Sequence, residues 1–421
     1  MTGAGMTGTL VVGASQAGVQ LAVSLRDCGD TDPITLIGDE PHVPYQRPPL
    51  SKAYLHGTTD LEQMMLRAPD YLVDRDITLI TGDRVDRIAR TAHGTGGEAV
   101  TASGLRLPFD RLALTVGARP RRLRVPGADL AGVRYLRTAD DASMLRDLQA
   151  GASAIVVVGG GFIGLEAAAV ARAQGKSVTV VEAGDRLIGR AVAPVMSEFY
   201  LAAHRRRGVD VRLGAQVVAM EARDSRVAAV VLSDGTRIAA DLVIVGIGVE
   251  PRTELAEQLG LDVSGGIVVD EMARTSLAGV VAAGDCTVQP HPLGGEGLVR
   301  LESVQNAVSQ AKVAAATLAG RDQPNVAVPW FWSDQYDLKL QIAGLSQGYD
   351  HWVVRGDVAA EAFSVLYYRG GELLAVDAVN AGADYMAVRK ALTQGGTISP
   401  GAAGDGATPL RERIVPTAIG A

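Results

Sequence analysis

The residues with the clearest chemical meaning in this chain are glycines. Gly159, Gly161 and Gly164 form a complete Gly-x-Gly-x-x-Gly motif directly after the β-branched run Ile155–Val158. In this setting the glycines permit a tight turn, a close approach to a pyrophosphate, and close packing of the following helix on the strand. The N-terminus of that helix favours an anion. Glu182 ends the next strand, where a carboxylate can bind ribose hydroxyls. We therefore predict a dinucleotide site here.

A second version of this pattern stands near the start of the chain. The segment Gly13–Gly18 follows the short β-rich run Thr9–Val12, and Asp39 supplies the later carboxylate. Ser15 replaces the middle glycine, so this motif alone is equally consistent with a plain βαβ turn that binds nothing. Two such units in one chain support each other. Together they predict two dinucleotides that lie close enough to react.

Most other chemistry is excluded. The chain has two cysteines, Cys28 and Cys286, which are far apart and outside any Cys-x-x-Cys motif. This excludes a disulfide framework, a zinc ribbon and a thioredoxin-like redox pair. We find no acid–base triad and expect no metal site. The cysteine usage suits a reducing cytoplasm.

Composition and charge are those of an ordinary globular protein. Of 421 residues, 47% are apolar and 21% are charged, which excludes wholesale disorder. The net charge of −7 does not provide the overall positive charge that is typical of nucleic-acid-binding proteins. No basic region precedes an early apolar run, and the apolar segment Leu10–Leu25 is interrupted by Gly, Ser and Gln. We therefore expect a soluble, cytoplasmic protein with no signal peptide and no membrane association.

The elements that must position the glycines alternate between helices and strands. Val19–Asp27 and Leu165–Gln174 have helical spacing, and each is followed by an apolar strand, Ile34–Ile37 and Val178–Val181. This alternation is typical of a parallel α/β sheet. A repeated supersecondary unit on this scale indicates duplicated domains rather than a solenoid.

From about Pro324 the sequence changes character. The cluster Trp330-Phe331-Trp332 is the densest aromatic group in a chain with only 4% aromatic residues. A helix is expected near Tyr385–Leu392, and the Gly/Ala/Pro-rich tail from Gly395 is expected to be loosely held. Four runs between these segments favour antiparallel strands: Leu338–Ala343, Trp352–Arg355, Phe363–Tyr368 and Glu372–Val376.

The expected fold class is α/β, with two Rossmann-like dinucleotide-binding domains and a C-terminal α+β domain that contains an antiparallel sheet. The expected boundaries are 1–112 with 247–323 for the first domain, 113–246 for the second and 324–421 for the third.

Four motifs in combination resemble a known family. They are Arg47-Pro48-Pro49-Leu50-Ser51-Lys52, Gly159–Glu166, Ala283-Gly284-Asp285 and Pro329–Gln335. They resemble the FAD-dependent, NADH-oxidising ferredoxin reductases of bacterial oxygenase systems, a family with putidaredoxin and rubredoxin reductases and a glutathione-reductase-like fold. The likeness covers almost the whole chain. One departure is Leu114-Thr115-Val116-Gly117, where the wider superfamily usually has Ala-Thr-Gly.

The resemblance implies FAD in the first cleft and NAD in the second. The residues expected along FAD are Gly13, Ser15, Ala17, Gly18, Asp39, Arg47, Lys52, Val85, Arg137, Asp285, Val304 and Trp332. The residues expected along NAD are Gly159, Gly161, Phe162, Ile163, Gly164, Glu182, Arg190 and Gly248.

Three residues are expected to act in the reaction by resemblance. Lys52 and Glu166 are expected beside the reactive flavin nitrogen and the nicotinamide, although each is otherwise an ordinary surface charge. Trp332 is expected to cover the flavin edge, although Trp330 and Trp332 equally suit a packed core. NADH delivers two electrons together and an iron–sulfur protein accepts one, so a flavin between them needs neither an acid–base triad nor a redox cysteine.

Two further positions are expected near the flavin by resemblance. Asp285 is expected to hold a ribitol hydroxyl, although a strand-end aspartate also caps turns. Ser303 is an N-cap for the helix that begins at Val304, and this helix N-terminus is expected to face the flavin pyrimidine.

The implied partner is an iron–sulfur ferredoxin, with Lys312 and Arg411 as candidate docking residues. A rubredoxin acceptor stays open, as does a non-enzymatic, redox-switched role like that of apoptosis-inducing factor. A flavin disulfide reductase lacks its cysteine pair here, and no cysteine near Lys52 supports a peroxide or NADH oxidase. Arg205–Arg207 before Gly208 favours cations at a helix C-terminus with a glycine cap rather than a binding patch.

Overall fold

The computed structural model describes residues 8–91 and 96–416. The chain divides into two compact units. Unit 1 comprises Met1–Gln46, Leu61–Arg119 and Val249–Pro329, and unit 2 comprises Arg47–Asp60, Pro120–Gly248 and Trp330–Ala421.

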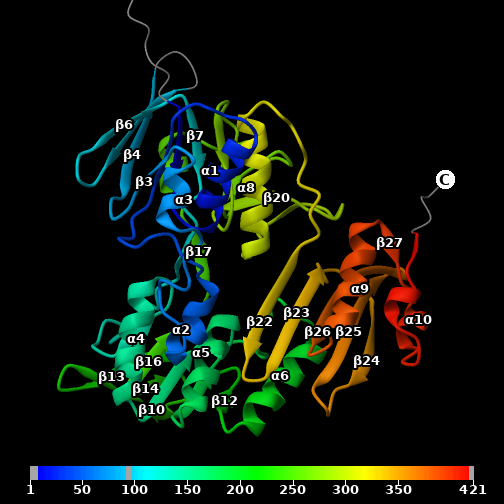
Figure 1. Cartoon of the computed structure of the whole chain (residues 1–421). Helices are drawn as coiled ribbons and strands as arrows, with labels where there is room; N and C mark the ends of the chain where they lie inside the picture. Colours follow the sequence, from blue (N-terminus) through cyan, green and yellow to red (C-terminus); the bar gives the residue numbers. More distant parts are fainter. Residues whose placement is uncertain (1–7, 92–95, 417–421) are drawn as a thin grey trace, which may run out of the picture. The chain divides into compact units, whose positions relative to one another are not determined.

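Unit 1 is built around a five-stranded parallel sheet with the order β19-β7-β1-β2-β3. Helices α1 (Gln16–Asp27) and α8 (Val304–Leu318) lie side by side, and their apolar faces pack into one core with the sheet (Figure 1). The strands are β1 (Thr9–Val12), β2 (Ile34–Ile37), β3 (Ile77–Ile80), β7 (Arg111–Leu114) and β19 (Val280–Ala282).

Smaller elements complete unit 1. One antiparallel sheet contains β4 (Val85–Arg90), β5 (Gly97–Thr101) and β6 (Arg106–Phe109), and another small sheet contains β18 (Ile267–Val268), β20 (Thr287–Pro290) and β21 (Leu298–Val299). The remaining elements are α3 (Pro69–Val73), α7 (Glu254–Gln258), and the strands β8 (Ala118–Pro120) and β17 (Val249–Pro251).

Unit 2 contains a second five-stranded parallel sheet with the order β12-β11-β10-β16-β9. The continuous β-branched run predicted to be a buried strand is β10 (Ala154–Val158) at the centre of this sheet. The other strands are β9 (Val133–Tyr135), β11 (Ser177–Val181), β12 (Asp210–Arg212) and β16 (Leu242–Val245).

Around this sheet lie three long helices and a three-stranded antiparallel sheet. They are α4 (Ala139–Gly151), α5 (Phe162–Ala173), α6 (Pro194–Arg206), β13 (Val217–Arg223), β14 (Arg226–Leu232) and β15 (Arg237–Ala239). The Pro-rich segment of unit 2 forms the short 3-10 helix η1 (Pro48–Ser51) and then α2 (Ala53–His56).

The C-terminal part of unit 2 is an antiparallel sheet with the order β22-β23-β26-β25-β24, packed against α9 (Gly382–Thr393). Its strands are β22 (Trp330–Gln335), β23 (Leu338–Gly344), β24 (His351–Asp357), β25 (Ala362–Arg369) and β26 (Glu372–Val379). The chain then forms β27 (Gly396–Thr397), α10 (Pro400–Gly404), η2 (Leu410–Glu412) and β28 (Val415–Pro416).

The predicted α/β class with an antiparallel C-terminal sheet is confirmed. The aromatic cluster Trp330-Phe331-Trp332 lies at the start of β22, an edge strand of this sheet. The three-domain division and the loose tail stay predictions, although Arg355 donates hydrogen bonds to the carbonyl oxygens of Ala403 and Thr408 in that tail. Within the described part of the chain, no helix combines the length and hydropathy needed to cross a membrane.

Candidate dinucleotide and redox sites

The first glycine turn joins β1 to α1. Gly13 has a φ of +116°, and a Cβ there would lie 2.2 Å from the Thr115 carbonyl oxygen. A Cβ on Gly18 would lie 2.0 Å from the Gly13 carbonyl oxygen, so side chains are excluded at both positions. Ser15 is the N-cap of α1 in an extended conformation, which L-residues adopt without strain. The missing middle glycine therefore imposes no backbone penalty on the turn.

A cavity of about 310 Å³ in unit 1 lies beside this turn. Three predicted residues, Gly13, Asp39 and Val85, line it together. Arg252 also lines the cavity and donates to the Asp39 carboxylate at 3.0 Å, a partner that the sequence motif did not indicate. The volume is at the lower end of the usual range for ligand pockets. A glycine turn, a helix N-terminus and a ribose-binding carboxylate fit the nucleotide end of a dinucleotide.

The strand β19 leads into Ala283-Gly284-Asp285, and α8 packs beside this segment. Gly284 has a φ of +87°, and a Cβ there would lie only 3.3 Å from the Ala17 side chain. The Gly284 N–H donates to the Gln310 side chain of α8 at 2.8 Å. Ser303 caps α8 by accepting from the Asn306 N–H, which confirms the predicted cap. The Gly284–Gln310 bond therefore links the turn that precedes Asp285 to α8.

The second glycine turn, in unit 2, has the same construction. A Cβ on Gly159 would lie 2.3 Å from the Gly246 carbonyl oxygen, and one on Gly164 would lie 2.3 Å from that of Gly159. At Gly161, by contrast, no described atom outside the local backbone lies within 4 Å of such a Cβ. The middle glycine thus leaves the space that a pyrophosphate needs.

Glu182 is fixed by the main chain around this turn. Its carboxylate accepts from the Gly160 N–H at 2.6 Å and from the Gly184 N–H at 2.7 Å. The carboxylate therefore stabilises the glycine turn itself, through the Gly160 N–H. The structure thus places Glu182 at the dinucleotide motif.

The other predicted NAD residues divide into two groups. Arg190 reaches Gly248, with Nη2 3.0 Å from the position of a Gly248 Cβ, so these two residues meet. Phe162 instead packs on Phe331 of β22 with ring centroids 4.6 Å apart, and the next residue, Ile163, is exposed. Packing explains Phe162 without a ligand.

The structure brings Lys52 and Glu166 together in unit 2. The Lys52 ammonium lies 2.7 Å from Glu166 Oε2, and it also donates to the Pro48 carbonyl oxygen at 3.2 Å. Glu166 lies on α5 with only 2% of its surface exposed, so it is not an ordinary surface charge. Two serines that sequence reasoning did not single out, Ser51 and Ser333, donate to the same carboxylate.

Two further predicted FAD residues in unit 2 contact each other. The Arg47 guanidinium donates to the Arg137 carbonyl oxygen at 2.8 Å. Trp332 is half-buried in β22, with its ring centroid 5.5 Å from that of Trp330. Arg389 lies over the Trp330 ring at 5.0 Å. Trp330 thus contacts both Trp332 and Arg389, while Trp332 is not part of the fully buried core.

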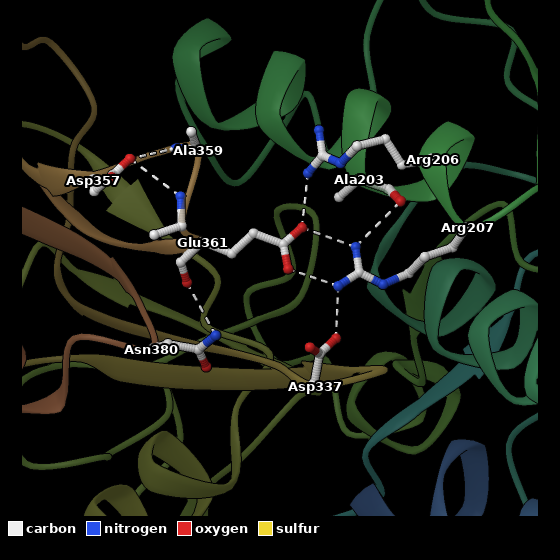
Figure 2. Close-up of polar contacts among 9 residues, drawn as sticks. Ala203, Arg206, Arg207, Asp337, Asp357, Ala359, Glu361 and Asn380 are labelled. Carbon is white, nitrogen blue, oxygen red and sulfur yellow. Dashed lines mark hydrogen bonds and ion pairs between the residues drawn. The ribbon is translucent and has the colours of Figure 1, made fainter.

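The arginine run at the end of α6 has structural partners. Helix α6 ends at Arg206, and Gly208 follows with a φ of +83°. Arg206 and Arg207 both pair with Glu361 at the β24–β25 turn, and Arg207 also pairs with Asp337 (Figure 2). The hydrogen bond from Arg207 holds the pKa of Glu361 down at about 2. These ion pairs favour the structural interpretation of the run over a binding patch.

The candidate docking residues lie in different units. Lys312 is exposed on α8 of unit 1, and Arg411 is exposed in η2 of unit 2. A shared docking patch stays a prediction.

The two cysteines do not form a disulfide. Cys28 and Cys286 are both free thiols, and Cys286 is fully buried. Burial raises the pKa of the Cys286 thiol to about 12, which disfavours the reactive thiolate. Among residues 8–91 and 96–416, no group of three or more His, Cys, Asp or Glu residues could hold a metal ion.

Comparison with known proteins agrees with this geometry. Residues 7–311 match the family model "Pyridine nucleotide-disulphide oxidoreductase", and residues 330–414 match "Reductase C-terminal". The chain is 50% identical over 396 residues to rhodocoxin reductase of Rhodococcus erythropolis, covering 94% of this chain and 92% of the relative. It is 42% identical over 410 residues to putidaredoxin reductase CamA of Pseudomonas putida, covering 96% of each.

A solved structure is similar over nearly the whole chain. The ferredoxin reductase for the CYP199A2 system from Rhodopseudomonas palustris has a TM-score of 0.93 and 42% identity, covering 97% of this chain and 100% of that one. The chain therefore belongs to the pyridine nucleotide-disulphide oxidoreductase family and, within it, to the FAD-dependent, NADH-oxidising ferredoxin reductases.

Proposed function

We propose that this reductase passes electrons from NADH through FAD to an iron–sulfur ferredoxin, which serves a monooxygenase or a dioxygenase. The observation that carries the proposal is the presence, in one chain, of two glycine turns and of two free cysteines that form no Cys-x-x-Cys pair. Two dinucleotides can then exchange a hydride, and without a dithiol the electrons must leave to an external acceptor. The 42% identity to a putidaredoxin reductase supports a ferredoxin as that acceptor.

The proposed roles follow from the geometry of the chain. Bound FAD would accept a hydride from NADH and release electrons singly. Gly13 and the N-terminus of α1 would hold the FAD pyrophosphate, and Asp39 would bind a ribose hydroxyl. Asp285 and the N-terminus of α8 would fix the ribitol and the flavin pyrimidine, where the helix dipole favours negative charge.

The unit 2 residues would orient the coenzyme and tune the reaction. Gly161 would admit the NADH pyrophosphate, and Glu182 would accept from the adenosine ribose. The Lys52 ammonium, held by Glu166, would place a positive charge at the flavin and favour its electron-rich form. Trp332 would cover the exposed flavin edge.

We also propose the domain division expected from the sequence: FAD-binding residues 1–112 and 247–323, NAD-binding residues 113–246, and a C-terminal domain over 324–421. The match of residues 330–414 to a separate family model supports the last boundary. We propose a cytoplasmic location, because reduced cysteines and NADH oxidation suit that compartment.

A rubredoxin acceptor is the alternative, because a rubredoxin-NAD(+) reductase of Pseudomonas putida is 37% identical over 372 residues. A simple experiment tests the proposal. The purified protein should be yellow and should bleach on anaerobic addition of NADH. Cytochrome c reduction should be fast only when a ferredoxin is added. Equal stimulation by rubredoxin, or turnover of cytochrome c without any carrier, would contradict the ferredoxin proposal.

A further inference from the structure

The buried Glu166 carboxylate is engaged on both of its oxygens. Oε2 accepts from the Ser51 hydroxyl at 2.5 Å and pairs with the Lys52 ammonium at 2.7 Å. Oε1 accepts from the Ser333 hydroxyl at 2.6 Å. A buried charge is stable only when it is paired and hydrogen-bonded, and all three donors together meet that condition here.

The three donors come from two separate parts of unit 2. Ser51 and Lys52 are adjacent at the end of η1, so the local turn places them together. Ser333 comes from β22 of the C-terminal sheet, 167 residues away from Glu166 in the sequence, and it is fully buried. The C-terminal sheet thus provides the hydrogen-bond donor for Glu166 Oε1.

Ser333 is itself oriented by a chain of buried side chains. Gln335 Nε2 lies 3.2 Å from Ser333 Oγ, and Gln335 Oε1 lies 2.8 Å from His204 Nε2. The Tyr336 hydroxyl lies 3.3 Å from His204 Nδ1. Gln335 and His204, like Ser333, have none of their surface exposed.

One placement of the hydrogen atoms satisfies every contact from Tyr336 through His204, Gln335 and Ser333 to Glu166. Burial lowers the pKa of His204 to about 4, so its imidazole is neutral at pH 7 and carries one N–H. Tyr336 then donates to Nδ1, His204 donates from Nε2 to Gln335, Gln335 donates to Ser333, and Ser333 donates to Glu166. All donors point toward the carboxylate, so the bonds polarise one another in the same direction.

We propose that Ser333, oriented by Gln335 and His204, is a positioning residue that holds Glu166 against Lys52. The C-terminal sheet thereby fixes the ammonium that the proposed function places at the flavin. The inference rests on that placement of Lys52, and not on the identity of the electron acceptor.

The test compares Ser333→Ala with a matched control. Ser364→Ala in β25 also removes a fully buried serine hydroxyl that donates to a carboxylate, that of Asp384 at 2.8 Å, but in a different cluster. The readouts are kcat and KM for NADH with ferricyanide as the acceptor, and the midpoint potential of the bound flavin. Loss of one hydrogen bond to a charged group predicts a fall in kcat of about tenfold for Ser333→Ala.

The expected pattern is a fall in kcat, a more negative flavin potential because Lys52 is less firmly held, and a KM for NADH that stays within about twofold. Ser364→Ala should match the parent in all three. In a Glu166→Gln background, Ser333→Ala should have no further effect, because the residue acts through that carboxylate. A full effect of Ser333→Ala in that background would overturn the proposal, as would parental kcat and potential in Ser333→Ala.

Gln335→Glu keeps the test decisive if Ser333→Ala does not fold. A carboxylate at position 335 cannot donate to Ser333 and competes for its hydroxyl, so Ser333 turns away from Glu166. This variant should reproduce the lower kcat and lower potential, and parental values would overturn the proposal. A parent enzyme that reduces ferricyanide but no ferredoxin would instead contradict the proposed acceptor, and would leave this inference intact.

Discussion

Glu182 combines two tasks at the end of β11. Its carboxylate already accepts two main-chain N–H groups, from Gly160 and Gly184, so it is held in place before any coenzyme binds. A carboxylate fixed in this way still has lone pairs for the ribose hydroxyls of NADH. It cannot swing away from a 2′-phosphate without breaking those main-chain bonds.

This geometry predicts a preference for NADH over NADPH of at least about tenfold in kcat/KM. Two like charges about 4 Å apart repel by roughly 4 kcal/mol at an effective dielectric near 20, and solvent exposure reduces this value. Even about 1.4 kcal/mol is tenfold. Arg186 offers the phosphate little compensation, since its guanidinium already donates to Ser197 and to the Val192 carbonyl oxygen.

The measurement is steady-state kinetics with both coenzymes in the parent and in Glu182→Ala. Glu182→Ala should reduce the ratio of kcat/KM for NADH to that for NADPH, mostly by weakening NADH binding. The substitution also removes the hydrogen bond that the Gly160 N–H makes to Glu182. Comparable kcat/KM values for NADH and NADPH in the parent enzyme would refute this role of Glu182.

Trp332 allows a second test at the residue scale. Its ring is half-buried and stacks on Trp330, so its removal leaves the main core intact. If it covers the flavin, Trp332→Ala should shift the visible flavin absorption and weaken FAD retention during gel filtration. Trp352→Ala, which removes a 46% exposed tryptophan on β24, is the matched control. An unchanged spectrum and full FAD content in Trp332→Ala would place Trp332 in ordinary packing.

At the scale of elements, the C-terminal sheet contains a buried carboxyl group that is hydrogen-bonded to a tyrosine on the adjacent strand. Asp377 of β26 accepts from the Tyr367 hydroxyl of β25 at 2.6 Å. Burial raises the pKa of Asp377 to about 7, whereas the Tyr367 hydrogen bond acts in the opposite direction. The folded protein therefore binds a proton at Asp377 that the unfolded chain has already lost, between about pH 4 and pH 7. Stability must fall as the pH rises through that window.

Asp377→Asn should remove this dependence. Relative to the parent, the free energy of unfolding of the variant should increase by on the order of a few kcal/mol between pH 4 and pH 8, because only the parent loses stability over that range. Urea midpoints at several pH values measure the difference. Tyr367→Phe removes the bond that lowers the pKa of Asp377, so the loss of stability should extend to higher pH in this variant than in the parent. Parallel pH profiles for parent and Asp377→Asn would contradict the assignment.

The same elements show what sequence reasoning can and cannot reach. The glycine turns were predictable because their signal is local: strand, turn and helix follow one another directly, and only glycine fits at Gly13 and Gly159. The contact of Ser333 with Glu166 was not predictable, since it depends on how a β-strand packs against a distant helix. Gln310 was missed for the same reason, because its bond to Gly284 joins α8 to the end of β19.

At the scale of the whole molecule, the negative net charge of the chain disfavours the approach of an acidic ferredoxin. The chain carries a net charge of −7, and ferredoxins are acidic, so the mean field repels the acceptor. Fast encounter then requires a local positive patch that steers the ferredoxin. Lys312 on α8 and Arg411 in η2 are the candidates, and both side chains are exposed.

Charge-reversal variants distinguish the effect of a local docking patch from the effect of the protein's net charge. Lys312→Glu and Arg411→Glu each change the net charge by two units, and so does Lys339→Glu at an exposed position on β23. Because all three variants alter the mean field equally, only a docking position should raise the KM for ferredoxin beyond the Lys339→Glu value. The increase should shrink at high ionic strength, where exposed charges are screened. Rates with ferricyanide should match across the three variants, because a small acceptor does not need the patch. If Lys312→Glu and Arg411→Glu slow both acceptors to the same extent, or raise the KM no more than Lys339→Glu does, neither residue belongs to the docking surface.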